Sequence, residues 1–207
     1  HRSYDWGYWY HYFGYRGDDE DSVHHSSNLQ GEAQLGADGT ATLSIDVPQS
    51  DFPSMREVMV STEVTDSNLQ TLTSTVESVV HPSSVYVGVS RIDRLVRAGE
   101  ELPLKIVAID PQEKPFNAAL KVTATLVREV NTTVKTQTEN GATTTRNDVT
   151  EETVTTAEFT LDPAASAKDG QVFTVKPVAT GLHFLTLRGV DPDGRPFATT
   201  TRFHAYG

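Results

Sequence analysis

The chain has 207 residues, with 17 basic and 28 acidic side chains, a formal net charge of -11 and no cysteine. At about 100 to 150 residues per domain, this length fits one large domain or two small ones. The lack of cysteine excludes disulfides, thiolate metal sites and a cysteine nucleophile. The acidic balance argues against nucleic-acid binding, which needs clustered basic residues.

The charge is spread unevenly along the chain. Residues 1–85 hold 3 basic and 13 acidic side chains, whereas residues 86–207 hold 14 and 15. This difference predicts two units with different surroundings. The alternative is a solvated acidic loop at residues 18–21, which supplies four of the thirteen acidic residues.

Residues 4–15 (YDWGYWYHYFGY) concentrate the aromatic side chains near the start of the chain. We expect a strand or hairpin arm that docks on its own domain or on a neighbour. The alternative is a surface for stacking sugars or for protein contact, centred on Trp6 and Trp9.

The chain opens at His1 in the middle of a pattern, so we expect a piece of a longer protein. No apolar run approaches the roughly 20 residues that span a bilayer.

The first unit contains three segments with strand periodicity, at residues 40–47, 56–64 and 71–80. In the first of them Ala41, Leu43, Ile45 and Val47 would share one face. His81-Pro82 then interrupts the pattern, because proline lacks a ladder donor and keeps its predecessor extended. We therefore predict a first domain over residues 1–83, with an aromatic and acidic segment at 4–28 and with its earliest strands missing.

The second unit, residues 84–207, shows about seven strands punctuated by turns, the number expected of an immunoglobulin-like or fibronectin-like sandwich. Apolar residues alternate along the strands, and Asn140-Gly141 and Asp191-Pro192-Asp193-Gly194 are typical of hairpin turns. The predicted fold is all-β, as tandem sandwiches. The inward-facing residues are expected to include Leu102, Leu104, Ile106, Ala108, Leu120, Val122, Ala124 and Leu126, and further strands are expected at 84–90, 143–161, 171–177, 182–190 and 197–205.

A long polar hairpin is predicted over residues 120–160, because bulky apolar residues almost vanish between Val134 and Phe159. A two-stranded ribbon that leaves the sandwich needs β-branched polar residues and no core face. Such a ribbon could contact a neighbouring domain or offer a segment to proteases. The alternative is a plain solvated hairpin.

The sequence offers no catalytic, cofactor or metal site, and we predict that the chain is not an enzyme. It has no nucleophile elbow, no phosphate-binding glycine loop and no calcium-loop spacing near Asp18–Asp21. The paired carboxylates Glu100-Glu101 and Glu151-Glu152 are interpreted as solvated edges, because adjacent strand residues face opposite ways. Arg16-Gly17-Asp18 resembles an integrin-binding tripeptide, and Asn131-Thr132-Thr133 fits a glycosylation acceptor, but tripeptides of this kind often arise by chance. The histidines near the start of the chain lack the spacing of zinc ligands; they are His1, His11, His24 and His25.

Several segments, in their order and spacing, resemble the bacterial alpha-2-macroglobulin family. The resemblance runs from about residue 31 to 207 and covers nearly the whole chain. It implies macroglobulin-like domains in which a V-x-V-H-P-type strand ends one domain and an aromatic-Val-Gly strand opens the next. The segments are Gly36–Ala41, Val58–Asp66, Val79–Val89 (VVHPSSVYVGV), Val107–Pro115, Gly181–Gly194 (GLHFLTLRGVDPDG) and Phe203–Gly207.

This resemblance implies a fragment of a large protease trap, in which a protease cleaves a bait region and the molecule collapses around it. Many members bond covalently through a Cys-Gly-Glu-Gln thioester, and this sequence has neither the cysteine nor the motif. The bait region is expected beyond Gly207. The implied partners are neighbouring domains of the same parent chain and target proteases, the implied location is the periplasm or cell envelope, and a lipid anchor on the parent is one option. The alternative function is an immunoglobulin-like adhesion or carbohydrate-binding module.

Overall fold

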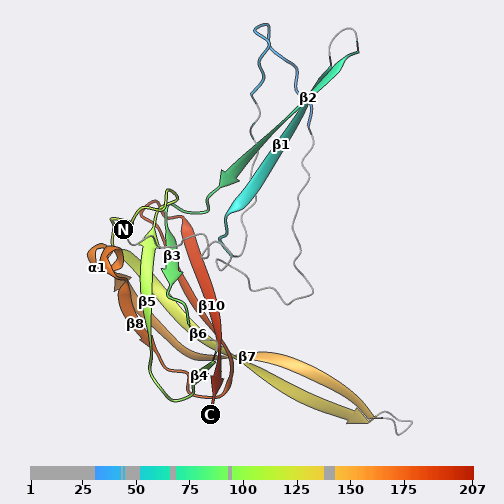
Figure 1. Cartoon of the computed structure of the whole chain (residues 1–207). Helices are drawn as coiled ribbons and strands as arrows, with labels where there is room; N and C mark the ends of the chain where they lie inside the picture. Colours follow the sequence, from blue (N-terminus) through green and yellow to red (C-terminus); the bar gives the residue numbers. More distant parts are fainter. Residues whose placement is uncertain (1–30, 43, 45–51, 66–68, 93–94, 138–142) are drawn as a thin grey trace.

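A computed structural model describes residues 31–42, 44, 52–65, 69–92, 95–137 and 143–207 of the protein. Strands make up almost all of the regular structure in these residues, and they form a two-layer body from which two long ribbons project (Figure 1). The elements are β1 (Arg56–Thr65), β2 (Thr71–Val80), β3 (Tyr86–Val89), β4 (Leu95–Arg97), β5 (Leu102–Ile109), β6 (Leu120–Gln137), β7 (Thr143–Leu161), α1 (Pro163–Lys168), β8 (Gln171–Val175), β9 (Gly181–Val190) and β10 (Pro196–Tyr206).

The body is a sandwich of a five-stranded sheet, in the order β4-β10-β9-β6-β7, and a three-stranded sheet, in the order β3-β5-β8. All pairs are antiparallel except the parallel pair of β4 with β10. The all-β sandwich prediction is confirmed for this part of the chain.

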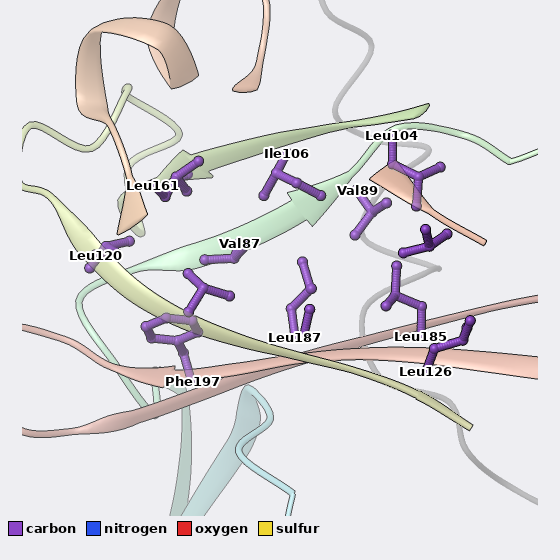
Figure 2. Packing of buried hydrophobic residues seen from close by; sticks show 14 of the residues in the cluster. Val87, Val89, Leu104, Ile106, Leu120, Leu126, Leu161, Leu185, Leu187 and Phe197 are labelled. Atoms are coloured by element: carbon purple, nitrogen blue, oxygen red, sulfur yellow. The ribbon is translucent and has the colours of Figure 1, made fainter. Parts of the chain in front are cut away.

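The core lies between the two sheets, where the alternating residues of facing strands meet. Leu104 and Ile106 of β5 are almost completely buried, as are Leu126 of β6 and Leu187 of β9. Figure 2 shows Val87 and Ile106 of the smaller sheet pointing toward the side chains of the larger one. The inward-facing residues predicted in β6 are all buried, and of those predicted in β5 only Leu102, at the start of the strand, is half-buried.

β6 and β7 are much longer than the strands beside them. β6 pairs with β9 only as far as Arg128↔His183, whereas its pairing with β7 continues to Gln137↔Thr143. Residues 129–137 and 143–151 therefore project from the body as a two-stranded ribbon, which we call the arm (Figure 1). The hairpin predicted over residues 120–160 is present as paired strands, but its inner half belongs to the core. The predicted turn at Asn140-Gly141 lies outside the described residues.

Two short elements were missed by the sequence patterns. α1 begins after Asp162, whose carboxylate accepts a hydrogen bond from the backbone N–H of Ala165 at 2.9 Å, with proline at the first helical position. Ser166 of this helix accepts a hydrogen bond from the backbone N–H of Ala108 at 2.8 Å, which ties α1 to β5. β4 has three residues and is held by parallel pairing to the end of β10.

Of the predicted first domain, the structure describes one two-stranded sheet, β1 with β2, which we call the ribbon. Residues 40–42 and 44 of the strand expected at 40–47 are described and belong to no strand, and the rest of that segment lies outside the described residues. The division at residue 83, and a sandwich before it, remain predictions.

Candidate functional site

The ribbon joins the sandwich through the carboxylate of Asp191, whose side chain is completely buried. Ser83 and Ser84 follow the ribbon in the chain, and their hydroxyls donate to Oδ2 of Asp191 at 3.0 and 2.8 Å. The backbone N–H of Ser84 donates to the same oxygen at 2.8 Å. We call Ser83, Ser84, Asp191, Asp193 and Arg195 the Asp191 junction. It connects two segments that lie more than one hundred residues apart in the sequence.

The carboxylate is held in place by its own turn between β9 and β10. Oδ1 of Asp191 accepts the backbone N–H of Asp193 at 3.0 Å and of Arg195 at 2.8 Å, and Nε of Arg195 donates to Oδ2 at 3.0 Å. Pro192 fits the second turn position, and Gly194 has a φ of 80°, a left-handed conformation that favours glycine. The predicted Asp-Pro-Asp-Gly turn is confirmed. Its first residue, Asp191, also binds Ser83 and Ser84, a contact that the turn pattern alone does not indicate.

The junction favours the ionised form of Asp191. Burial by itself raises the pKa of a carboxyl group, but the hydrogen bonds from Ser84, Arg195 and Ser83 outweigh burial and hold the pKa of Asp191 well below its usual range. A charged carboxylate that accepts several N–H and O–H donors forms stronger hydrogen bonds than a neutral acceptor. The site is therefore suited to a structural role, in which hydrogen bonds to the ionised carboxylate hold the Ser83-Ser84 segment against the turn between β9 and β10.

Two further contacts hold the base of the ribbon. Nδ1 of His81 lies 2.6 Å from the hydroxyl of Tyr86, across the segment that leads from β2 into β3. Before β1, the ring of Phe52 lies under the guanidinium of Arg188, with its centroid 5.7 Å from Cζ. The ribbon is thus attached to the sandwich on both sides of its base.

Glycine at position 189 permits close packing beside the Phe52 contact. A Cβ atom at Gly189 would lie 2.5 Å from the backbone oxygen of Lys121 and 2.5 Å from the ring of Phe197. A shallow recess of about 300 Å³ remains on this outer face of the sheet, lined by Pro53, Thr123, Arg188, Gly189, Pro196, Phe197 and Ala198.

A second groove, of about 400 Å³, lies between β7 and β8 at the open side of the sandwich. Its lining is mainly apolar and includes Leu126, Val154, Phe173 and Val178. The polar residues of the lining are Thr155, Thr174 and Lys176, of which Lys176 is titratable. Phe173 stacks on Phe159 with ring centroids 4.7 Å apart. The lining carries no pair of groups for acid–base or nucleophilic chemistry.

His183 is a buried polar residue that the sequence patterns did not single out. Its ring stacks on Phe203 at a centroid distance of 5.4 Å, and Nδ1 lies 3.0 Å from the backbone oxygen of Gly181. Burial lowers the pKa of His183 and favours the neutral ring. The residue occupies an inward position of β9, as the alternation of that strand requires.

The candidate carboxylate pairs are all exposed. Glu100 lies 3.6 Å from Arg97, and Glu152 lies 3.6 Å from Arg128 on the partner strand.

Asn131-Thr132-Thr133 lies exposed on the arm, where Nδ2 of Asn131 donates to Glu129 at 3.1 Å. Within the described ranges, no three histidine, aspartate or glutamate side chains gather in a way that could hold a metal ion.

Several predicted features fall outside the described residues. They are the aromatic segment 4–15 with Trp6 and Trp9, the tripeptide Arg16-Gly17-Asp18, the acidic run Asp18–Asp21, and His1, His11, His24 and His25. In the part of the chain that is described, no helix is long and apolar enough to cross a membrane.

Comparison with known proteins gave matches among solved structures alone: neither a family model nor a curated protein matches the sequence. The Salmonella alpha-2-macroglobulin reacted with methylamine is 17% identical, with a TM-score of 0.48, over 75% of this chain and 10% of that one. The native conformation of the E. coli alpha-2-macroglobulin is 19% identical, with a TM-score of 0.46, over 72% of this chain and 10% of that one. The chain spans about a tenth of the length of these proteins.

Proposed function

We propose that the chain is a non-catalytic framework segment of a bacterial alpha-2-macroglobulin-like protease-trapping inhibitor, built from macroglobulin-like β-sandwich domains. The observation that carries the proposal is the Asp191 junction. Two of the segments on which the sequence resemblance depends, Val79–Val89 and Gly181–Gly194, are in direct contact there through Ser83, Ser84 and Asp191. If both motifs help to hold the same connection between two units, we expect them to lie in contact although they are far apart in the sequence.

This geometry fits a structural role, which is to fix the direction in which the ribbon extends from the sandwich. The segment between β2 and β3 is short, and its polar atoms are held by a buried carboxylate and by Tyr86. Hydrogen bonds to a buried charge hold such a connection against the sandwich and favour movement of the two as one body. In a trap that rearranges after cleavage, such a framework would carry movement from one domain to its neighbours.

The proposal includes partners and a location. The partners are neighbouring domains of the same parent chain and, through the whole molecule, target proteases; nucleic acid is not among them. The location is the periplasm or cell envelope, to be tested by fractionating cells of the source bacterium and probing for the parent polypeptide.

The function is tested with the parent polypeptide and a protease that cleaves it. A caged protease remains open to a small peptide substrate but is shielded from a large protein substrate. We expect cleavage of the large substrate to fall while cleavage of the small one persists. If both activities remain unchanged, or if both fall together, the trapping function is wrong. An Asp191→Asn parent should protect the large substrate less well than an Asp193→Asn parent.

A further inference from the structure

The ribbon has one polar and one apolar face. Its antiparallel register places directly opposed residues on the same side, so that Val60 and Val76 face one way while Met59 and Glu77 face the other. All three glutamates of the ribbon, Glu57, Glu63 and Glu77, share the polar face. The other side, which we call the ribbon's apolar face, carries six apolar residues together with Arg56 at its end and three hydroxyl side chains. The apolar residues are Val58, Val60, Val64, Leu72, Val76 and Val80, and the hydroxyl residues are Thr62, Ser74 and Ser78.

This apolar face is largely uncovered in the described structure. Leu72 is 78% exposed and Val76 is 64% exposed. Among the described strands, β1 and β2 pair with each other alone. An isolated two-stranded hairpin is marginally stable in water, and burial of its valine and leucine side chains would stabilise it. Four of these six side chains are exposed, and Val58 and Val60 are half-buried, which indicates a surface that another segment covers.

The sequence contains a segment whose period, length and composition match this face. In residues 4–15 five of the six even positions are aromatic, and the sixth is Gly14, so an extended strand would present five rings on one side. The five are Tyr4, Trp6, Tyr8, Tyr10 and Tyr12. Twelve extended residues span about 40 Å, and the ten paired residues of β1 span about 33 Å. The forty residues between Tyr15 and Arg56 are far longer than the ribbon, so the connection allows the approach.

Two other considerations favour this occupant. The other apolar strand-like segment before the ribbon, residues 40–47, is described at 40–42 as exposed and outside any strand. Aromatic rings also pack well on β-branched side chains across strands, while tyrosine hydroxyls reach water at the edge. The acidic residues Asp18–Asp21 follow directly, and a face without acidic side chains does not repel them.

We propose that the aromatic segment Tyr4–Tyr15 of this chain packs in extended form on the ribbon's apolar face, with the side that carries Tyr4, Trp6, Tyr8, Tyr10 and Tyr12 inward. Trp6 then lies against the valines and leucine of the ribbon, and Trp9 points away from them. This proposal is independent of the protease-trapping function. It assigns to the aromatic segment an intramolecular role in place of a ligand-binding one.

The test uses tryptophan fluorescence, because Trp6 and Trp9 are the only tryptophans in the chain. The variant Leu72→Gln/Val76→Gln changes the apolar face, and Met59→Gln/Val79→Gln is the matched control on the polar face. Met59 has the same 64% exposure as Val76. We expect the first variant to shift the emission to the red and to raise acrylamide quenching, while the control matches the unmodified protein. Equal responses of the two variants would overturn the proposal.

Single-tryptophan proteins provide a second readout that leaves the ribbon unchanged. In Trp9→Phe the remaining Trp6 should be shielded from acrylamide, and in Trp6→Phe the remaining Trp9 should be quenched readily. Equal quenching, or the reverse order, contradicts the proposed orientation. Shielding that disappears on dilution, with a mass of two chains at high concentration, would assign the face to a second copy instead. Saturable changes in emission on adding glycans would assign the tryptophans to sugar binding and would also overturn the proposal.

Discussion

Replacing Asp191 with asparagine should cost much of the stability that the Asp191 junction provides. Asparagine keeps one acceptor oxygen but puts an NH₂ group where the second oxygen was. The hydroxyls of Ser83 and Ser84 can rotate to accept from this group, but N–H donors cannot. If the NH₂ group takes the Oδ2 position, it faces the N–H groups of Ser84 and Arg195 Nε; in the Oδ1 position it faces those of Asp193 and Arg195.

Either orientation therefore leaves two N–H donors without an acceptor. A buried unsatisfied donor costs about 1–3 kcal/mol, and Arg195 is partly exposed, so we expect Asp191→Asn to lower the free energy of unfolding by about 3 kcal/mol. The assay is urea unfolding followed by far-UV circular dichroism, with the slope against urea checked for constancy.

Asp193→Asn is the matched control, because Asp193 pairs with the same arginine at 2.7 Å but is 70% exposed. An exposed ion pair contributes about 0–1 kcal/mol, so this variant should remain close to the unmodified protein. The reasoning is refuted if the two variants lose the same free energy of unfolding within the error of the measurement.

Three further predictions concern pH, packing and the arm. Because the folded pKa of Asp191 lies below its unfolded value of about 3.9, its contribution is complete above that pH and falls as the medium becomes more acidic, so Asp191→Asn should flatten the acid side of the stability curve measured by urea unfolding. Gly189→Ala should lose about 2–3 kcal/mol in the same assay, because its Cβ would overlap Lys121 and Phe197, and an unchanged midpoint would contradict the packing described. Leu126→Ala should cost about 2–5 kcal/mol by thermal and urea unfolding, whereas Val134→Ala, on the arm of the same strand, should cost under about 0.5 kcal/mol; similar losses would show that the arm is part of the core.

The strands of the sandwich could be predicted because their evidence is local. A strand buried on one face has a period of two, so Leu120, Val122, Ala124 and Leu126 show their orientation without reference to any other part of the chain. The Asp191–Gly194 turn was predictable for the same reason, since each residue type satisfies a condition set by its own backbone.

The Asp191 junction could not be predicted in the same way. Ser83-Ser84 and Asp191 are each sufficiently explained by their local turns, and nothing in either segment indicates that they meet. Their contact depends on how β3 and the turn after β9 are brought together by the sheets, which is a property of the topology. The sequence patterns also missed α1 and β4. These elements have six and three residues, which is too short to show a periodic pattern of apolar residues.

The length of β6 and β7 was predicted, but not the place where the core ends. The polar composition beyond Val134 indicates a ribbon that leaves the sandwich, whereas the change from core to arm occurs where β9 stops pairing, at Arg128. That position is determined by the length of a different strand. A sequence pattern in β6 alone therefore cannot locate it.

We infer that the Asp191 junction holds the ribbon in a fixed direction relative to the sandwich. The most direct test is a spin-label distance measurement between Glu77→Cys on β2 and Thr174→Cys on β8; both positions are exposed, and the chain has no other cysteine. A narrow distance distribution is predicted, retained in Asp193→Asn and broadened in Asp191→Asn. A distribution that is equally broad with and without the Asp191 carboxylate would contradict the claim.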